Sequence, residues 1–70
     1  QVAPYVSYAE SVAVQEQDIE LFESLLNQAL SVDTDEYLQY RLVNIIMQKR
    51  ARWLLERKDD LILPPLDAID

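Results

Sequence analysis

The sequence predicts an all-α chain, with an antiparallel helix pair that follows a short N-terminal helix or helical turn. Three observations predict this class. Apolar residues recur every three or four positions along most of the chain, which is the spacing of one helix face. Glycine is absent, and the three prolines stand only at position 4 and at positions 64 and 65. All six basic residues lie between Arg41 and Lys58, and acidic segments flank them on both sides, as expected of helices packed side by side.

The first helical stretch is predicted over Pro4 to Val14. Tyr5, Tyr8 and Val12 recur at helical spacing, and proline is favoured in the first turn of a helix. Several residues between them are valine or serine, which form helices only moderately well. The pattern therefore indicates a short helix or a single helical turn.

The second helix is predicted from Glu16 to Leu30 and has the clearest pattern. One apolar stripe, widened by Leu21, runs along it: Ile19, Phe22, Leu25, Leu26, Ala29 and Leu30. Its early turns are rich in carboxylates, which the positive end of the helix dipole stabilises there. The helix is expected to stop near Ser31.

The third helix is predicted to run without interruption from about Glu36 to about Asp60. Asp33 and Glu36 have the spacing of a capping box, in which an acceptor side chain caps the helix and a Glu three residues later reaches back. The apolar residues form two stripes: Leu38, Leu42, Ile45, Ile46 and Trp53 on one, and Val43, Met47, Ala51, Leu54 and Leu61 on the other. Two stripes predict a helix that is contacted from more than one side. The rest of its own chain or another subunit is expected to cover the face that the second helix leaves free.

Pro64 and Pro65 forbid further helix, so residues 64–70 are expected to form an extended or disordered tail. A short strand over 61–63 is the alternative for the segment before the prolines. The chain opens on Gln1 in place of an initiator Met, so residues 1–63 are expected to belong to a larger helical domain; the resemblance described below implies that they are its C-terminal helical segment. The sequence is thus interpreted as a piece of something longer.

The composition excludes several classes of function. The chain has no cysteine, histidine or glycine, which removes the disulfide framework, the thiol nucleophile, the imidazole base and the usual zinc ligands. A glycine-rich phosphate loop is excluded for the same reason. The net charge of −7 argues against nucleic acid as a partner, and no charge-free stretch is long enough for a membrane span. We therefore expect no enzyme, no cofactor and no metal site, while the redox compartment stays open.

Arg50, Arg52 and Trp53 form the most distinctive local pattern, a basic patch that contains the single tryptophan. Such a patch can grip a carboxylate or the acidic face of a protein partner. The structural alternative, which the sequence favours, makes Trp53 a core anchor with arginines lying over it or pairing with acids of adjacent helices. Tyr5 and Tyr8 are candidates for an aromatic rim of the same interface.

Four segments carry a resemblance to a known family: Tyr5–Val14, Gln17–Asp18, Phe22–Leu30, and Arg41–Arg57 with the Asp59-Asp60-Leu61 that follows it. The most specific element combines Leu42 and Asn44 with the run Gln48–Leu55. These segments resemble the C-terminal part of the T-component family of tripartite ATP-independent periplasmic (TRAP) transporters. The sequence departs from the family by having Gln15 where a proline is expected, and by lacking the signal peptide, the lipidated cysteine and most helical repeats.

The resemblance implies an all-helical periplasmic lipoprotein with tetratricopeptide-like helix pairs. Such a protein pairs with the solute-binding subunit of the transporter and assists uptake of small hydrophobic or carboxylate-bearing ligands. No catalytic residues are implied. The alternative function is a generic helical interaction module, in which the free face of the helix over 36–60 is buried in a homo-oligomer.

Overall fold

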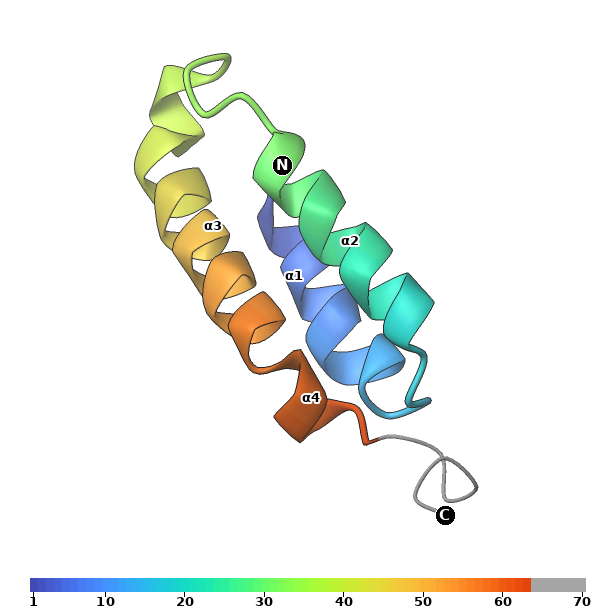
Figure 1. Ribbon diagram of the computed structural model, residues 1–70. Helices are drawn as coiled ribbons and strands as arrows, with labels where there is room; N and C mark the ends of the chain where they lie inside the picture. Colours follow the sequence, from blue (N-terminus) through green and yellow to red (C-terminus); the bar gives the residue numbers. More distant parts are fainter. Residues whose placement is uncertain (64–70) are drawn as a thin grey trace.

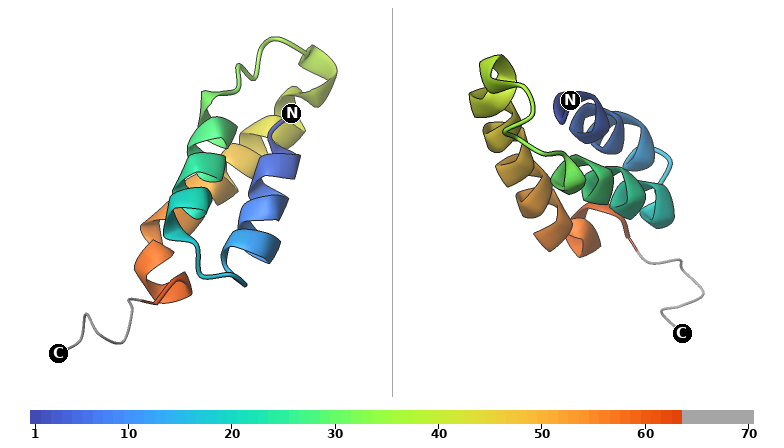
Figure 2. Two further views of the ribbon diagram at one scale, coloured as in Figure 1. Left: turned by 90° about the vertical axis from the view of Figure 1, so that its right-hand side faces the viewer. Right: turned by 90° about the horizontal axis from the view of Figure 1, so that it is seen from above.

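The computed structural model describes residues 1–63, which form a bundle of helices without a strand (Figure 1). Three helical rods follow one another along the chain and alternate in direction. α2 (Ile19–Ser31) is antiparallel to the rod before it and to α3 (Arg41–Glu56), and all three views agree on this order (Figure 2). The all-α prediction and the predicted antiparallel pair are confirmed. The tail predicted over 64–70 lies outside the described residues.

The first rod combines two kinds of helix. α1 (Ala3–Tyr8) continues directly into a π-helical segment, η1 (Ala9–Ala13), so the predicted helix over 4–14 is confirmed. Its inward face is fully buried and consists of small or β-branched residues: Val2, Val6, Ala9 and Ala13. Because two of these are alanines, the rod lies close against its neighbours.

The turn between the first rod and α2 delays the start of the second helix. Gln17 adopts a positive φ of 55°. Glycine is the residue that most easily adopts this conformation, but the chain has none. Asp18 then serves as the N-cap, because its Oδ1 accepts from the backbone N–H of Leu21 at 3.1 Å. The predicted start at Glu16 is therefore wrong by three residues.

α2 supplies the centre of the core. Phe22, Leu26 and Ala29 are fully buried, and the other apolar members of the predicted stripe pack beside them. These positions recur at i, i+4 and i+7 and so face one side of the helix. The predicted stripe is confirmed.

The predicted capping box at Asp33 and Glu36 is wrong. The Asp33 carboxylate instead accepts from the N–H of Asp35 at 2.9 Å, and the Asp33 carbonyl accepts from the N–H of Glu36 at 3.3 Å. Asp33 thus closes a local turn, which aspartate does as readily as it caps a helix. One turn of 3-10 helix, η2 (Leu38–Tyr40), intervenes before α3 begins at Arg41.

The predicted single helix from Glu36 to Asp60 is also wrong at its far end. α3 ends at Glu56, Arg57 leaves the helical region (φ −103°, ψ 12°), and a short helix α4 (Lys58–Leu61) follows at an angle (Figure 1). The break lets Ile62, only 7% exposed, reach the core. A straight helix would carry this side chain past the end of the bundle.

The Gln17 side chain binds the backbone at the end of α4 and just after it. Its Nε2 donates to the Leu61 carbonyl at 3.0 Å, and its Oε1 accepts from the Leu63 N–H at 2.7 Å. The Leu61 carbonyl is left without a helical donor at the end of α4, and the Leu63 N–H lies just beyond that end, so one side chain satisfies both groups. The alternative of a strand over 61–63 is wrong, because these groups bond to a side chain and not to a second strand.

Two amide side chains of α3 join it to the other rods. Asn44 is buried, and its Oδ1 accepts from the N–H of Val2 at 3.3 Å. Gln48 donates to the carbonyls of Val32 at 2.9 Å and Ala29 at 3.1 Å. Both carbonyls lie at the C-terminal end of α2, where carbonyls run short of helical donors; that of Ala29 also accepts from the cap N–H of Val32 at 3.5 Å. α3 therefore contacts both other rods, as the two-stripe pattern predicts.

Replacing Gln48 by alanine is expected to lower the free energy of unfolding by about 1 kcal/mol, the usual net value of such a hydrogen bond. The carbonyls at the end of α2 would lose their side-chain donor but remain partly open to water. Urea unfolding followed by circular dichroism measures the change. Gln39→Ala, at an exposed position without a side-chain hydrogen bond within residues 1–63, is the matched control. Equal stability of the two variants would contradict the role of Gln48 in joining α3 to the end of α2.

Candidate functional site

A surface groove lies between the end of the first rod and the C-terminal half of α3. Its volume is about 330 Å³, and its walls come from η1 with the residue that follows it, from α3 and from α4: Glu10, Val14, Arg50, Trp53, Leu54 and Leu61. Three of these residues are apolar aliphatics and two are oppositely charged. The groove therefore combines a hydrophobic floor with a polar edge.

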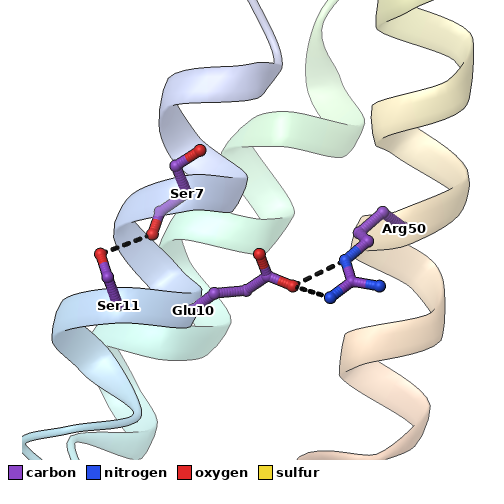
Figure 3. A network of polar contacts seen from close by, with 4 residues as sticks. All are labelled: Ser7, Glu10, Ser11 and Arg50. Carbon is purple, nitrogen blue, oxygen red and sulfur yellow. Dashed lines mark hydrogen bonds and ion pairs between the residues drawn. The ribbon is translucent and has the colours of Figure 1, made fainter.

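An ion pair closes one side of the groove. Arg50 Nε donates to Glu10 Oε1 at 2.6 Å, and a terminal nitrogen of the same guanidinium contacts the same oxygen (Figure 3). Next to it, the Ser11 hydroxyl donates to the Ser7 carbonyl at 2.7 Å, one turn back along the first rod. The pair links positions forty residues apart. Because both side chains are partly exposed, it contributes at most about 1 kcal/mol to stability. Its larger effect is to fix the direction of Arg50.

Two guanidinium groups lie close to the ring of Trp53. Arg50 is 5.3 Å and Arg57 is 5.1 Å from the centre of the indole ring, within the range of cation–π attraction. The indole is 45% exposed, so the interpretation of Trp53 as a core anchor is wrong. The other half of that interpretation is confirmed, because arginines lie over the ring and Arg50 pairs with an acid of an adjacent helix.

Only some of the residues predicted to bind a partner line the groove. Arg50 and Trp53 line the groove together. Arg52, two positions away on α3, is exposed and does not line it. Tyr5 packs partly against the core, and Tyr8 is 50% exposed. These two tyrosines lie on the first rod and do not line the groove either.

Sequence reasoning missed Glu10 and Arg57 as members of this site. Arg57 follows Trp53 by four residues, so helical spacing would have placed the two on one face. No local pattern signals Glu10, because its partner Arg50 lies forty positions later and meets it only after folding. Val14 and Leu61 line the groove for the same tertiary reason.

The groove and the indole beside it offer apolar, aromatic and cationic groups on one surface. A half-exposed indole with neighbouring guanidiniums accepts an apolar or aromatic group that carries a carboxylate. Among residues 1–63 no three carboxylates come together in a way that would hold a metal ion. No helix in this range is both long and apolar enough to cross a membrane.

A second exposed feature runs along the outer face of α3 and the turn before it. We define the outer strip as Leu38, Leu42, Ile46 and Trp53, which are 73%, 70%, 54% and 45% exposed. Val43, 54% exposed, lies at its edge. The opposite face of α3 carries the buried Ala51 and Leu54 and packs on the other rods. The predicted surplus apolar face is therefore present, and within residues 1–63 no element covers it.

Comparison with known proteins adds one finding. The family model described as TRAP transporter T-component matches residues 1–62, which is nearly the whole of the 70-residue chain. No curated protein and no solved structure gives a significant match.

Proposed function

We propose that this chain, which belongs to the TRAP transporter T-component family and so is an accessory component of a TRAP transport system, docks the solute-binding protein of that system. The proposal assigns it a scaffold role without catalysis. The observation that carries it is the half-exposed Trp53 beside Arg50 and Arg57. Tryptophan and arginine are the residues that most often dominate the energy of a protein interface.

The proposal includes where and in what context the protein acts. It places the chain in the periplasm, as part of a lipid-anchored protein built from tetratricopeptide-like helix pairs. Residues 1–63 would be the C-terminal segment of that helical domain. The alternation of rod directions in the bundle is compatible with stacked helix pairs.

The docking surface is proposed to centre on Trp53, with Arg50 and Arg52 beside it and Tyr5 and Tyr8 as a separate patch on the first rod. Because Glu10 already pairs with Arg50, the guanidinium is held ready at the groove edge. A carboxylate of the partner would then find a fixed donor next to an apolar surface. This fit is expected for an acidic side chain that stands beside an apolar one on the partner.

Replacing Trp53 by alanine is expected to weaken binding of the solute-binding protein at least tenfold. The loss follows because a central aromatic anchor typically contributes about 2 kcal/mol or more to an interface. Titration with the solute-binding protein, followed by the fluorescence of this single tryptophan in the parent chain and by calorimetry in the variant, measures the affinity.

Tyr37→Ala, at an aromatic residue that is 56% exposed and outside the groove, serves as the control. The control is expected to bind as the parent chain does. A folded parent chain that does not bind the solute-binding protein would refute the docking role. Equal losses in the two variants would refute the assignment of Trp53.

A second candidate function is a generic interaction or oligomerisation module. It is favoured by the outer strip of α3, which leaves four large apolar side chains exposed. The strip can be covered by the rest of a longer chain, by another subunit or by a second copy. A chain that self-associates stably while the solute-binding protein fails to bind would favour this function over docking.

A further inference from the structure

The last residues that the structure describes are attached to the bundle at few points. None of the four residues of α4 is buried, and of residues 58–63 only Ile62 is, at 7% exposure. Segments with few buried apolar contacts open at a lower free energy than the core. We propose that residues 58–63 form a strap that swings off the bundle as one unit about Arg57, with the Gln17 side chain as the latch that holds it closed.

Arg57 has the features of a hinge between α3 and the strap. The backbone hydrogen bonds of α3 end at its N–H, which donates to the Leu54 carbonyl at 3.1 Å. Those of α4 begin at its carbonyl, which accepts from the N–H groups of Asp60 and Leu61 at 3.0 and 3.1 Å. Rotation about the Arg57 backbone therefore turns α4 without breaking any of these hydrogen bonds. Residues at the ends of elements commonly absorb such a change of φ and ψ.

Gln17 binds the far end of the strap with one side chain. α4 lies beside the turn that carries this residue (Figure 1), where Nε2 donates to the Leu61 carbonyl at 3.0 Å and Oε1 accepts from the Leu63 N–H at 2.7 Å. The second hydrogen of Nε2 goes to the Val14 carbonyl, at 2.7 Å, within the turn itself. This bond does not involve the strap, so it keeps the amide in place when the strap opens. The strap then closes onto a preorganised partner.

Opening of the strap changes the groove beside it. Leu61 belongs to the strap and forms part of the groove wall, with Val14 and Leu54 as apolar neighbours there. When the strap swings out, Leu61 leaves the wall, so the groove widens at this end. Lys58 Nζ contacts Glu23 Oε2 of α2 at 3.2 Å in the closed form, but both side chains are 40% exposed, so this pair adds little to the closure. The strap thus sets the width of the groove, whichever group the groove accepts.

The backbone of Gln17 allows the latch to be tested apart from the turn. Its φ of 55° lies in the left-handed region, which glycine adopts freely and asparagine adopts more readily than most other residues. Gln17→Gly and Gln17→Asn therefore suit the turn at least as well as glutamine does. Asparagine is shorter by one methylene group and glycine has no amide, so neither reaches the strap as glutamine does. A loosened strap in these variants therefore reports the latch and not the turn.

Thiol labelling of the full chain tests whether the strap opens by itself. The chain has no cysteine, so Ile62→Cys places a single thiol in the buried part of the strap, and Ala29→Cys places one in the core at the other end of α2. Dithionitrobenzoate reacts with a buried thiol only when its site opens. The urea dependence of an opening follows the surface that it exposes. Labelling of the Ile62→Cys chain is therefore expected to vary little with urea below the unfolding transition, and that of the Ala29→Cys chain steeply. The same steep dependence at both sites would overturn the strap, because Ile62 would then leave the core only when the whole bundle unfolds.

Labelling of the Ile62→Cys chain also tests the latch. Gln17→Asn and Gln17→Gly are each expected to speed it about tenfold, the effect of losing one or two hydrogen bonds of ordinary net strength. The matched control is Gln15→Asn, at an exposed position of the same turn without a side-chain hydrogen bond within residues 1–63, and it is expected to leave the rate unchanged. Circular dichroism establishes which variants are folded, and either Gln17 variant decides the question alone. An unchanged rate in a folded Gln17 variant would show that this side chain is no latch.

Binding of anilinonaphthalene sulfonate, a dye that fluoresces on exposed apolar surface, tests the link to the groove. The Gln17→Gly chain is expected to bind more of the dye than the parent chain does. Val14→Thr, which makes the groove wall more polar at nearly constant volume, is expected to reduce this gain. Faster labelling at position 62 without any gain in dye binding would mean that the strap opens but does not set the width of the groove.

Discussion

Replacing Leu26 by alanine is expected to destabilise the fold by about 2–5 kcal/mol, the range for a buried leucine in a packed core. Leu26 is fully buried at the centre of α2, between the other two rods. Truncation removes apolar contacts and leaves a cavity that rigid helices close only in part. A domain of this size rarely has more than about 3–5 kcal/mol of stability, so a large share of the variant is expected to be unfolded at room temperature.

Urea unfolding in dilute solution, followed by circular dichroism, measures this loss. The matched control is Leu63→Ala, which makes the same chemical change at a side chain that is 66% exposed. Leu63 uses only its backbone N–H to bind Gln17, and that group survives the substitution. The free energy of unfolding of this control is expected to lie within about 0.5 kcal/mol of that of the parent chain. A Leu26 variant as stable as this control would contradict the core described here.

Replacing Asn44 by alanine is expected to lower the free energy of unfolding by about 1–3 kcal/mol. The loss is expected although alanine has the higher helix propensity and asparagine is a polar residue. Asn44 is only 4% exposed, and its Oδ1 is the acceptor for the N–H of Val2, a residue that is fully buried. Without that acceptor, a buried donor at the start of the first rod would be left unpaired, which costs its full desolvation. The expected result is a less stable bundle whose first rod opens most easily.

Asn27→Ala is the matched control for this prediction, because Asn27 lies on the exposed face of α2. Its replacement is expected to be neutral or slightly stabilising, as helix propensity alone predicts. Unfolding in urea compares the two variants, and hydrogen exchange of the Val2 N–H reports the local effect. A gain in stability for Asn44→Ala, or no faster exchange at Val2, would show that the hydrogen bond does not hold the first rod.

The sequence predicts the helical class and the apolar face of α2 because both depend on short-range spacing. Residues 19 to 30 repeat every three to four positions, and no glycine or proline interrupts them. The family resemblance noted in the sequence is confirmed by the match over residues 1–62. The docking of a solute-binding protein and the periplasmic location stay predictions.

The errors at the ends of helices share one cause. Asp33 and Asp18 are both good capping residues, yet only Asp18 caps a helix while Asp33 closes a turn. The choice depends on how the connection must cross from α2 to α3. The break at Arg57 is equally invisible in the sequence, where no proline or glycine marks it. It follows from the core, which receives Ile62 only if the helix bends.

The candidate site could be predicted in part. The pattern of Arg50 and Trp53 is local, and it correctly indicates arginines near the ring. The exposure of the indole depends on which face of α3 meets the other rods, and two apolar stripes do not by themselves say which is inward. Glu10 enters the site only because the first rod packs beside α3.

Local spacing along the chain thus determined that this protein is helical, which residues of α2 face inward and where its charges gather, because side chains three or four positions apart share a helix face. Packing among the three rods decided the rest: where α3 starts and ends, that Trp53 faces solvent, and that Glu10 meets Arg50. These features depend on contacts between residues forty or more positions apart, such as those of Asn44 with Val2 and Gln17 with Leu61. Their energies exist only when the whole bundle has formed.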